Sequence, residues 1–122
     1  MATPRKNPIS DCPITAASAA AGGKWKLIVV YWLAESPRNF GELRSLMPSI
    51  SQKVLSEQLR GLVADEIVDR QRTGKPPAPV RYSLTEYGRS LVPVVEAIRR
   101  WGRNHIDRFA TRAEQQKRGG GS

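Results

Sequence analysis

The chain of 122 residues has the length of one domain, and its hydrophobic content of 39% supports a modest core. It carries 20 Lys and Arg residues against 11 Asp and Glu residues, a formal net charge of +9, which favours a polyanionic partner. Arg outnumbers Lys by 14 to 6, which favours nucleic acid over a membrane surface, and no apolar run reaches the ~20 residues of a membrane-spanning helix.

The N-terminal segment is polar and contains two prolines and two basic residues, so a flexible arm is predicted over residues 1–10. It has no apolar segment before a cleavage site, so we expect a cytoplasmic protein. In the next segment, DCPITAASAAAGG, Pro13 suits the first position of a helix and Gly22-Gly23 suits its end. These signals predict a short helix with Cys12 at its N-terminus.

The segment KWKLIVVYWLAE is ambiguous, because its apolar run fits a buried strand or a helix that is hydrophobic all round. Its length and the following Ser36-Pro37 favour a helix. The next segment, FGELRSLMP, has apolar residues at helical spacing and is closed by Pro48. A second, shorter helix is therefore predicted there.

The segment SISQKVLSEQLRGLV begins with Ser49 followed three residues later by Gln52, the pattern of a capping box. A helix is predicted to start at Ser49, with an apolar face that includes Leu55, Leu59 and Leu62. After it, IVDRQR and VRYSL alternate in polarity and flank a loop with three prolines. This pattern predicts a basic β-hairpin.

The last predicted element is a long helix that Thr85 caps and that Pro93 bends or breaks. Its apolar face is larger than a small domain can cover, which predicts a homodimer through the terminal helices. The predicted dimer-interface residues are Ile14, Leu91, Val94, Val95, Ile98 and Trp101. Residues 110–122 contain few core residues and are predicted to be a flexible tail, which leaves residues 11–109 as the domain.

Two helices joined by the tight MPSIS turn and followed by a basic hairpin predict a mainly α fold with a small β-hairpin wing, the winged helix-turn-helix. The second helix of such a pair presents its first turns to the major groove, and Gln, Lys and Ser side chains suit base edges. On pattern alone, a merely solvated polar face is an equal alternative. Arginine and lysine of the wing and of the preceding helix are predicted to contact phosphates. The predicted DNA-binding residues are Ser51, Gln52, Lys53, Ser56, Gln58, Arg72, Lys75, Arg38 and Arg44.

From about Asp11 to Trp101 the sequence resembles the HxlR-type winged helix-turn-helix transcriptional regulators, relatives of the MarR group. The matching motifs are CPI, GGKWKLIVVYWL, RNFGELRSLMPSISQKVLSEQLRGLVADEIVDR and RYSLTEYGRSLVPVVEAIRRWG. The resemblance implies that KWKLIVVYWL is a core helix, that the terminal helices form a homodimer and that the wings touch double-stranded DNA. A two-fold dimer in turn implies a palindromic operator.

Proteins that look like this one include sensors of oxidants or electrophiles that use a cysteine in the same CP position. At a helix N-terminus, with Arg5 and Lys6 nearby in sequence, the pKa of Cys12 is predicted to fall, although Asp11 opposes this. A sensing cysteine and an inert thiol are equal alternatives. Because the chain has no second cysteine, oxidation would give a disulfide between two Cys12 residues, a mixed disulfide or an adduct.

Metal binding and catalysis have little support, because the one histidine, His105, has no partner ligands and Cys12 has no positioned base in any motif. We expect no enzyme, metal or cofactor. The alternative function is non-specific nucleic-acid binding. Binding to single strands would need exposed stacking rings, whereas the aromatic residues Trp25, Tyr31, Trp32 and Trp101 fall in apolar helix patterns.

Overall fold

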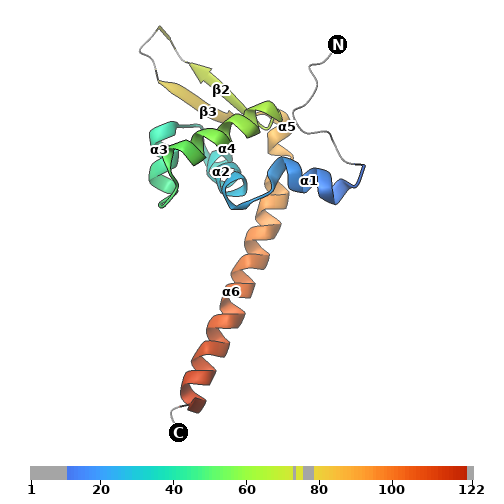
Figure 1. Ribbon diagram of the computed structural model, residues 1–122, viewed down its shortest axis with the longest axis vertical. Helices are drawn as coiled ribbons and strands as arrows, with labels where there is room; N and C mark the ends of the chain where they lie inside the picture. The colour runs from blue at the N-terminus through green and yellow to red at the C-terminus, as the bar shows by residue number, and fades with distance from the viewer. Residues whose placement is uncertain (1–10, 73, 76–78, 121–122) are drawn as a thin grey trace.

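The computed structural model describes residues 11–72, 74–75 and 79–120, and the predicted arm over residues 1–10 lies outside them. The described residues form six helices and one antiparallel sheet of three strands (Figure 1). The elements in chain order are α1 (Pro13–Ala21), α2 (Lys24–Glu35), β1 (Arg38–Asn39), α3 (Phe40–Leu46), α4 (Gln52–Ala64), β2 (Val68–Arg72), β3 (Val80–Leu84), α5 (Glu86–Arg89) and α6 (Val92–Gly120). This arrangement confirms the predicted mainly α winged helix-turn-helix.

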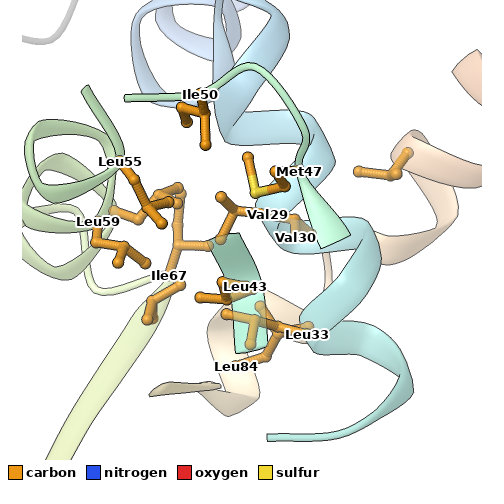
Figure 2. Packing of buried hydrophobic residues seen from close by; sticks show 13 residues of the cluster. Val29, Val30, Leu33, Leu43, Met47, Ile50, Leu55, Leu59, Ile67 and Leu84 are labelled. Atoms are coloured by element: carbon orange, nitrogen blue, oxygen red, sulfur yellow. The ribbon is translucent and has the colours of Figure 1, made fainter. Parts of the chain in front are cut away.

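The core lies between α2, α3, α4 and the base of the sheet (Figure 2). Helix α2 is the central element, and its Val29, Val30 and Leu33 are almost fully buried. The apolar run of KWKLIVVYWLAE is therefore helical, as its length predicted. From α4 the leucines of the predicted apolar face, Leu55 and Leu59 among them, complete the core.

The connection between α3 and α4 corrects the predicted capping box. Helix α4 begins at Gln52, with Ser51 as its N-cap, and the Val54 amide donates to Ser51 Oγ at 3.1 Å. Ser49 lies outside the helix with φ of 79°, in the left-handed region. The turn must bury Ile50 before the helix can start, so the capping signal at Ser49 yields to packing.

A capping box does occur at the start of α3, where none was predicted. The Glu42 amide donates to Asn39 Oδ1 at 2.8 Å, and the Asn39 amide donates to Glu42 Oε1 at 3.1 Å. This reciprocal pair satisfies two amides that the helix leaves free. It fixes where the first helix of the helix-turn-helix begins.

Strands β2 and β3 form the predicted hairpin, in which Val68 pairs with Leu84, Arg70 with Tyr82 and Arg72 with Val80. Directly paired residues project from the same face, so one face of the hairpin changes from buried valine and leucine at its base to arginine farther out. The two-residue strand β1, which pairs with β3, was not predicted because it is too short to show alternation.

The predicted long helix is divided in two. Helix α5 ends at Arg89, and α6 starts at Val92, so Pro93 lies in the first turn of α6, where a missing amide hydrogen costs little. Thr85 is the N-cap of α5, as predicted, and the Gly88 amide donates to its Oγ1 at 2.8 Å. The break thus precedes the proline.

Helix α6 packs against α2 near its start and then projects away from the body of the domain (Figure 1). It continues to Gly120, so residues 110–120 of the predicted tail are helical, while residues 121–122 lie outside the described residues. The tail has few core residues, but ATRAEQQK consists mainly of good helix formers, so the helix extends without a core to cover. The domain boundary predicted at residue 109 is therefore not a helix boundary.

Candidate nucleic-acid interface

The N-terminus of α4 presents the first group of predicted DNA-binding residues. Gln52 and Lys53 are exposed on its first turn, directly after the N-cap residue Ser51. The Ser51 oxygen accepts the Val54 amide, so the hydroxyl hydrogen is the group that remains for a donor contact. The turn thus offers a hydroxyl donor, an amide and an ammonium group, which together suit base edges and phosphate.

The next residues of α4 divide between two sides of the helix. Ser56 lines a hollow together with Arg70 and Tyr82, so it faces the wing. Gln58 follows two residues later, about 200° around the helix. Its side of α4 contains Gly61, where an added Cβ would lie 3.3 Å from Lys26 Nζ of α2. The structure therefore places Ser56 and Gln58, which were predicted as one set, on different sides.

The wing carries basic residues in two places. Arg72 is exposed near the end of β2 and shares a sheet face with Arg70, because both pair on that face across the hairpin. Lys75 is exposed in the loop that joins the strands. The hairpin of β2 and β3 extends beyond the body of the domain (Figure 1), and its Arg70 lines a hollow together with Ser56 of α4.

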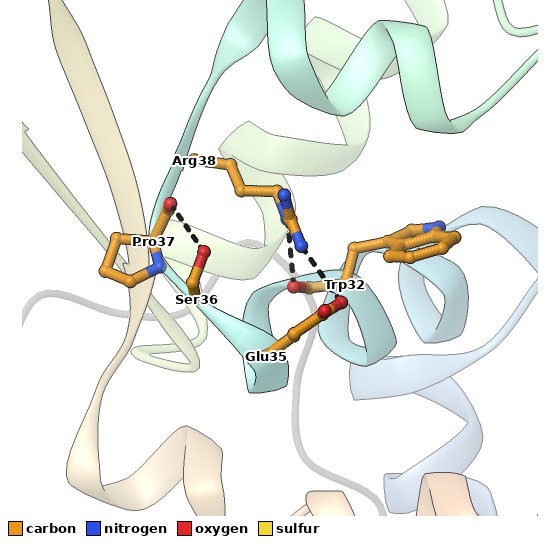
Figure 3. A network of polar contacts seen from close by, with 5 residues as sticks. All are labelled: Trp32, Glu35, Ser36, Pro37 and Arg38. Carbon is orange, nitrogen blue, oxygen red and sulfur yellow. Dashed lines mark hydrogen bonds and ion pairs between the residues drawn. The ribbon is translucent and has the colours of Figure 1, made fainter.

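Arg38 and Arg44, the predicted residues near the first helix of the pair, differ in their surroundings. Arg38 Nε donates to the Trp32 carbonyl oxygen at 3.1 Å, and its Nη2 forms an ion pair with Glu35 at 3.0 Å (Figure 3). The guanidinium also lies 5.7 Å from the Trp32 ring centre. Arg38 thus ties the end of α2 to β1, and its predicted contact with the DNA backbone stays a prediction. Arg44 is exposed on the last turn of α3.

Three residues near this surface were absent from the predicted set: Arg60, Arg70 and Tyr82. Arg60 and Arg70 are exposed and line the hollow beside Ser56, while Tyr82 is partly buried there. The spacing of Ser56 and Arg60, four residues apart, puts them on one helix face and was visible in the sequence. Arg70 and Tyr82 face the same helix because of the register of the hairpin strands. The sequence did not predict this register, because the loop with three prolines is not a standard hairpin turn.

Cys12 is the N-cap residue of α1 and is exposed. The backbone amide of Thr15, followed by the Thr15 hydroxyl and the backbone amide of Ile14, stabilises the thiolate and lowers the pKa of Cys12. This agrees in direction with the predicted effect of the helix N-terminus. Arg5 and Lys6, the other predicted cause, lie outside the described residues.

The predicted dimer residues fall into two groups. Val95 is only 6% exposed and belongs to the core of its own chain, and Leu91 packs partly against that core, so Val95 is corrected to a core residue. Val94 and Ile98 are each 48% exposed, Trp101 is 67% exposed, and Ile14 on α1 is 78% exposed. We call Val94, Ile98 and Trp101 the α6 apolar stripe.

Two ring contacts continue the apolar face of α6 beyond the α6 apolar stripe. The rings of Trp101 and His105 are stacked with centroids 4.8 Å apart, and His105 meets the edge of Phe109 at 4.7 Å. His105 is thus one of three rings on a helix face. In the described residues, no group of three or more His, Cys, Asp or Glu side chains is placed to hold a metal ion.

A model of the HxlR-like helix-turn-helix family matches residues 20–110. The chain belongs to this family. It is 43% identical over 96 residues to the uncharacterized HTH-type transcriptional regulator YybR of Bacillus subtilis, an alignment that covers 79% of this chain and 77% of YybR.

Solved structures of HxlR-like architecture agree with this assignment. The chain is similar to the redox regulator HypR in its oxidized form, with a TM-score of 0.73, 43% identity and coverage of 76% of this chain and 96% of HypR. It is also similar to the reduced form of the transcriptional regulator YodB from B. subtilis, with a TM-score of 0.66, 35% identity and coverage of 75% and 91%. The protein is thus an HxlR-type, DNA-binding transcriptional regulator. Its described helices include none that is long and apolar enough to span a bilayer.

Proposed function

We propose that the protein binds a palindromic operator in double-stranded DNA as a homodimer, with sequence recognized by the N-terminal half of α4. The observation that carries the proposal is the exposed Gln52 and Lys53 on the first turn of α4, beside a wing with exposed Arg72 and Lys75. Polar groups at the start of the second helix can contact base edges in the major groove. Basic wing residues can hold phosphates on either side of it.

Within this proposal the residues have distinct roles. Gln52 contacts a base edge, and Ser51 and Ser56 add hydroxyl contacts on the wing side of α4. Lys53, Arg72, Lys75 and Arg44 contact phosphates and give affinity without sequence preference. Gln58 packs on the side of α4 that faces α2 and contributes no base contact.

Gln52 and Gln58 form a matched pair that tests these roles. Gln52→Ala should reduce the ratio of affinities for a selected and a scrambled duplex roughly ten-fold, because a bidentate amide contact with adenine gives about 1–3 kcal/mol of discrimination. Gln58→Ala, which removes the same side chain from the other side of the same helix, should leave that ratio within two-fold. Fluorescence anisotropy with duplexes selected from a random library measures both.

Two results would contradict the proposal. Equal effects of both substitutions would remove the assigned role of Gln52. Equal binding of selected and scrambled duplexes by the unsubstituted protein would favour the alternative, a non-specific nucleic-acid-binding protein.

Oxidant or electrophile sensing through Cys12 is a second proposal, supported by the exposed thiol with its lowered pKa. The similarity to the redox regulator HypR adds to this support. In a dimer, two Cys12 thiolates would form one disulfide, while diamide takes up the two electrons and two protons released by the thiols. A monothiol together with diamide, which takes up the two electrons and two protons, would instead give a mixed disulfide. A quinone would give an adduct, in which the sulfur adds to a ring carbon and the thiol proton passes to the quinone oxygen.

Cys12→Ser tests the sensing proposal, because serine keeps the size and hydrogen-bonding capacity but not the redox chemistry. Diamide should change the operator affinity of the unsubstituted protein by at least several-fold and leave that of Cys12→Ser unchanged. Non-reducing electrophoresis should show a cross-linked dimer only with Cys12 present. An equal diamide response in both proteins would exclude Cys12 as the sensor.

A further inference from the structure

A shallow hollow lies between α4 and the hairpin, and we call it the α4–wing hollow. Its lining residues are Ser56, Leu59, Arg60, Val63, Arg70 and Tyr82. It lies beside the first turns of α4 and is not part of the α6 apolar stripe or the surroundings of Cys12. The proposed function as stated above leaves it without a role.

The two sides of the hollow come from different elements that pack together. Ser56 and Arg60 are four residues apart on α4 and therefore project from one face of the helix. Arg70 and Tyr82 are directly paired across the hairpin and project from one face of the sheet. The fold thus directs two guanidinium groups and two hydroxyl groups to the same hollow.

The charged residues in the lining are both positive. Among the described residues, no Asp or Glu lines the hollow. Asp69, next to Arg70 in sequence, points to the other face of β2, where its carboxylate accepts from Gln71 Nε2 at 2.9 Å. Two exposed arginines therefore face this hollow without a carboxylate in its lining to neutralise them.

This composition suits a tetrahedral oxyanion. Guanidinium groups donate paired hydrogen bonds to phosphate oxygens, and the hydroxyl groups of Ser56 and Tyr82 can donate to the remaining oxygens. Leu59 and Val63 supply an apolar floor, which weakens the competition from water for these bonds. An uncharged ligand would leave the two positive charges uncompensated.

We propose that the α4–wing hollow binds one phosphate group of the DNA backbone, held jointly by Arg60 and Arg70. The inference rests on the proposed function, because it requires that α4 and the wing meet the same duplex. A phosphate held between a helix and a strand fixes the rotation of α4 relative to the groove. The hollow thus positions Gln52 against the base edges and contacts no base itself.

The salt dependence of operator binding distinguishes one shared phosphate from two separate contacts. Arg60→Ala and Arg70→Ala should each weaken binding roughly ten-fold, since hydrogen bonds to a charged group are lost. Each should also reduce the slope of log K against log salt by about one. The double variant should reduce that slope by about one as well, because both arginines serve the same phosphate.

Arg81→Ala is the matched control, because Arg81 is exposed and pairs with Gln71 on the opposite face of the same hairpin. It removes the same charge and should leave the salt slope unchanged. All four variants replace exposed residues, so equal urea midpoints should exclude unfolding as the cause. A double variant that reduces the slope by two, or an Arg81→Ala effect equal to the others, would overturn the shared-phosphate inference.

Neutral methylphosphonate linkages placed one at a time in the selected duplex provide the second measurement. Several positions in each half-site should weaken binding of the unsubstituted protein, and one of them, the phosphate held in the hollow, should have no effect on the double variant. Sensitivity at every position that persists in the double variant would overturn the inference. Failure of the unsubstituted protein to bind any duplex would instead contradict the proposed function itself.

Competition by inorganic phosphate, added at constant ionic strength, tests whether the hollow binds a phosphate of the DNA backbone or a free phosphate anion. With a backbone phosphate in the hollow, millimolar phosphate should inhibit the unsubstituted protein more than the double variant, and one methylphosphonate position should lose its effect in the double variant. Selective inhibition of the unsubstituted protein, with no methylphosphonate position that loses its effect in the double variant, would assign the hollow to a free anion and overturn the DNA contact.

Discussion

At the scale of single residues, Gly88 joins the wing to the helices that follow it. A Cβ at Gly88 would lie 2.0 Å from the Ile67 carbonyl oxygen, a backbone atom that cannot move as the end of a side chain can. The same junction is closed by Thr85, whose amide donates to Ile67 O at 3.0 Å and whose hydroxyl donates to Glu66 O at 2.6 Å. The base of the hairpin and α5 therefore form one tightly packed unit.

Gly88→Ala should lower the free energy of unfolding by about 3 kcal/mol, because a backbone shift is needed to admit the methyl group. Gly41→Ala is the matched control: it is also a helical glycine, and its added Cβ would meet only Asn39 Oδ1 at an ordinary 3.5 Å. Urea unfolding followed by circular dichroism compares the two. A loss for Gly88→Ala no greater than that for Gly41→Ala would show that the junction can adjust.

The thiol of Cys12 shows how far local sequence predicts a residue's chemistry. The proline after it and the run of alanines predict the helix start, and the amides of that first turn do lower the thiol pKa. The direction of the shift was thus predictable, because its causes lie within three residues along the chain. The exposure of the sulfur was not, because it depends on what packs against α1.

At the scale of elements, sequence pattern predicted those whose signals are local. Helices α1, α2 and α3 and both long strands lie where length, proline and glycine signals place them. The N-cap of α4 is Ser51, two residues after the predicted Ser49, because the burial of Ile50 displaces it. Strand β1 was missed because only its pairing with β3 defines it.

In the candidate interface too, the features with local sequence signals were predicted and those that depend on packing were not. The side chains on the first turn of α4 were predicted from residue type and helix position, and Gln52 and Lys53 are exposed there. The contacts of Arg38 with the carbonyl and ring of Trp32 and with the carboxylate of Glu35 were not predicted, because no spacing rule reveals them. The α4–wing hollow was missed because it requires the register of the hairpin and the packing of α4 on β2.

At the scale of the whole molecule, the excess positive charge is not confined to the proposed DNA-facing side. Helix α6 alone carries the described arginines Arg99, Arg100, Arg103, Arg108 and Arg112. This helix projects away from α4 and the wing (Figure 1). Net charge therefore supports a polyanionic partner for the molecule but does not locate the contact, and the proposed location depends on the hollow and the wing instead.

The exposed α6 apolar stripe sets the final prediction, which concerns the proposed homodimer. Trp101→Ala should weaken dimerisation by roughly 2 kcal/mol, about 30-fold, because tryptophan is among the residue types that dominate interfaces and this side chain is exposed on an apolar stripe. Arg100→Ala, an exposed neighbour one position away on α6, is the control and should change it little. Sedimentation velocity over a range of concentrations measures both.

Operator binding should respond to Trp101→Ala in a characteristic way. A dimer binds both half-sites at once, and this gain in affinity is lost when the dimer dissociates. Affinity for the full palindrome should therefore fall, while affinity for a single half-site stays constant. Loss at the half-site as well would indicate a misfolded domain. An unchanged dimer would place the contact elsewhere, with the exposed Ile14 of α1 the next surface to substitute. Val95 is unsuited to that test, since its side chain is buried in its own core and its removal would unfold the protein before it revealed an interface.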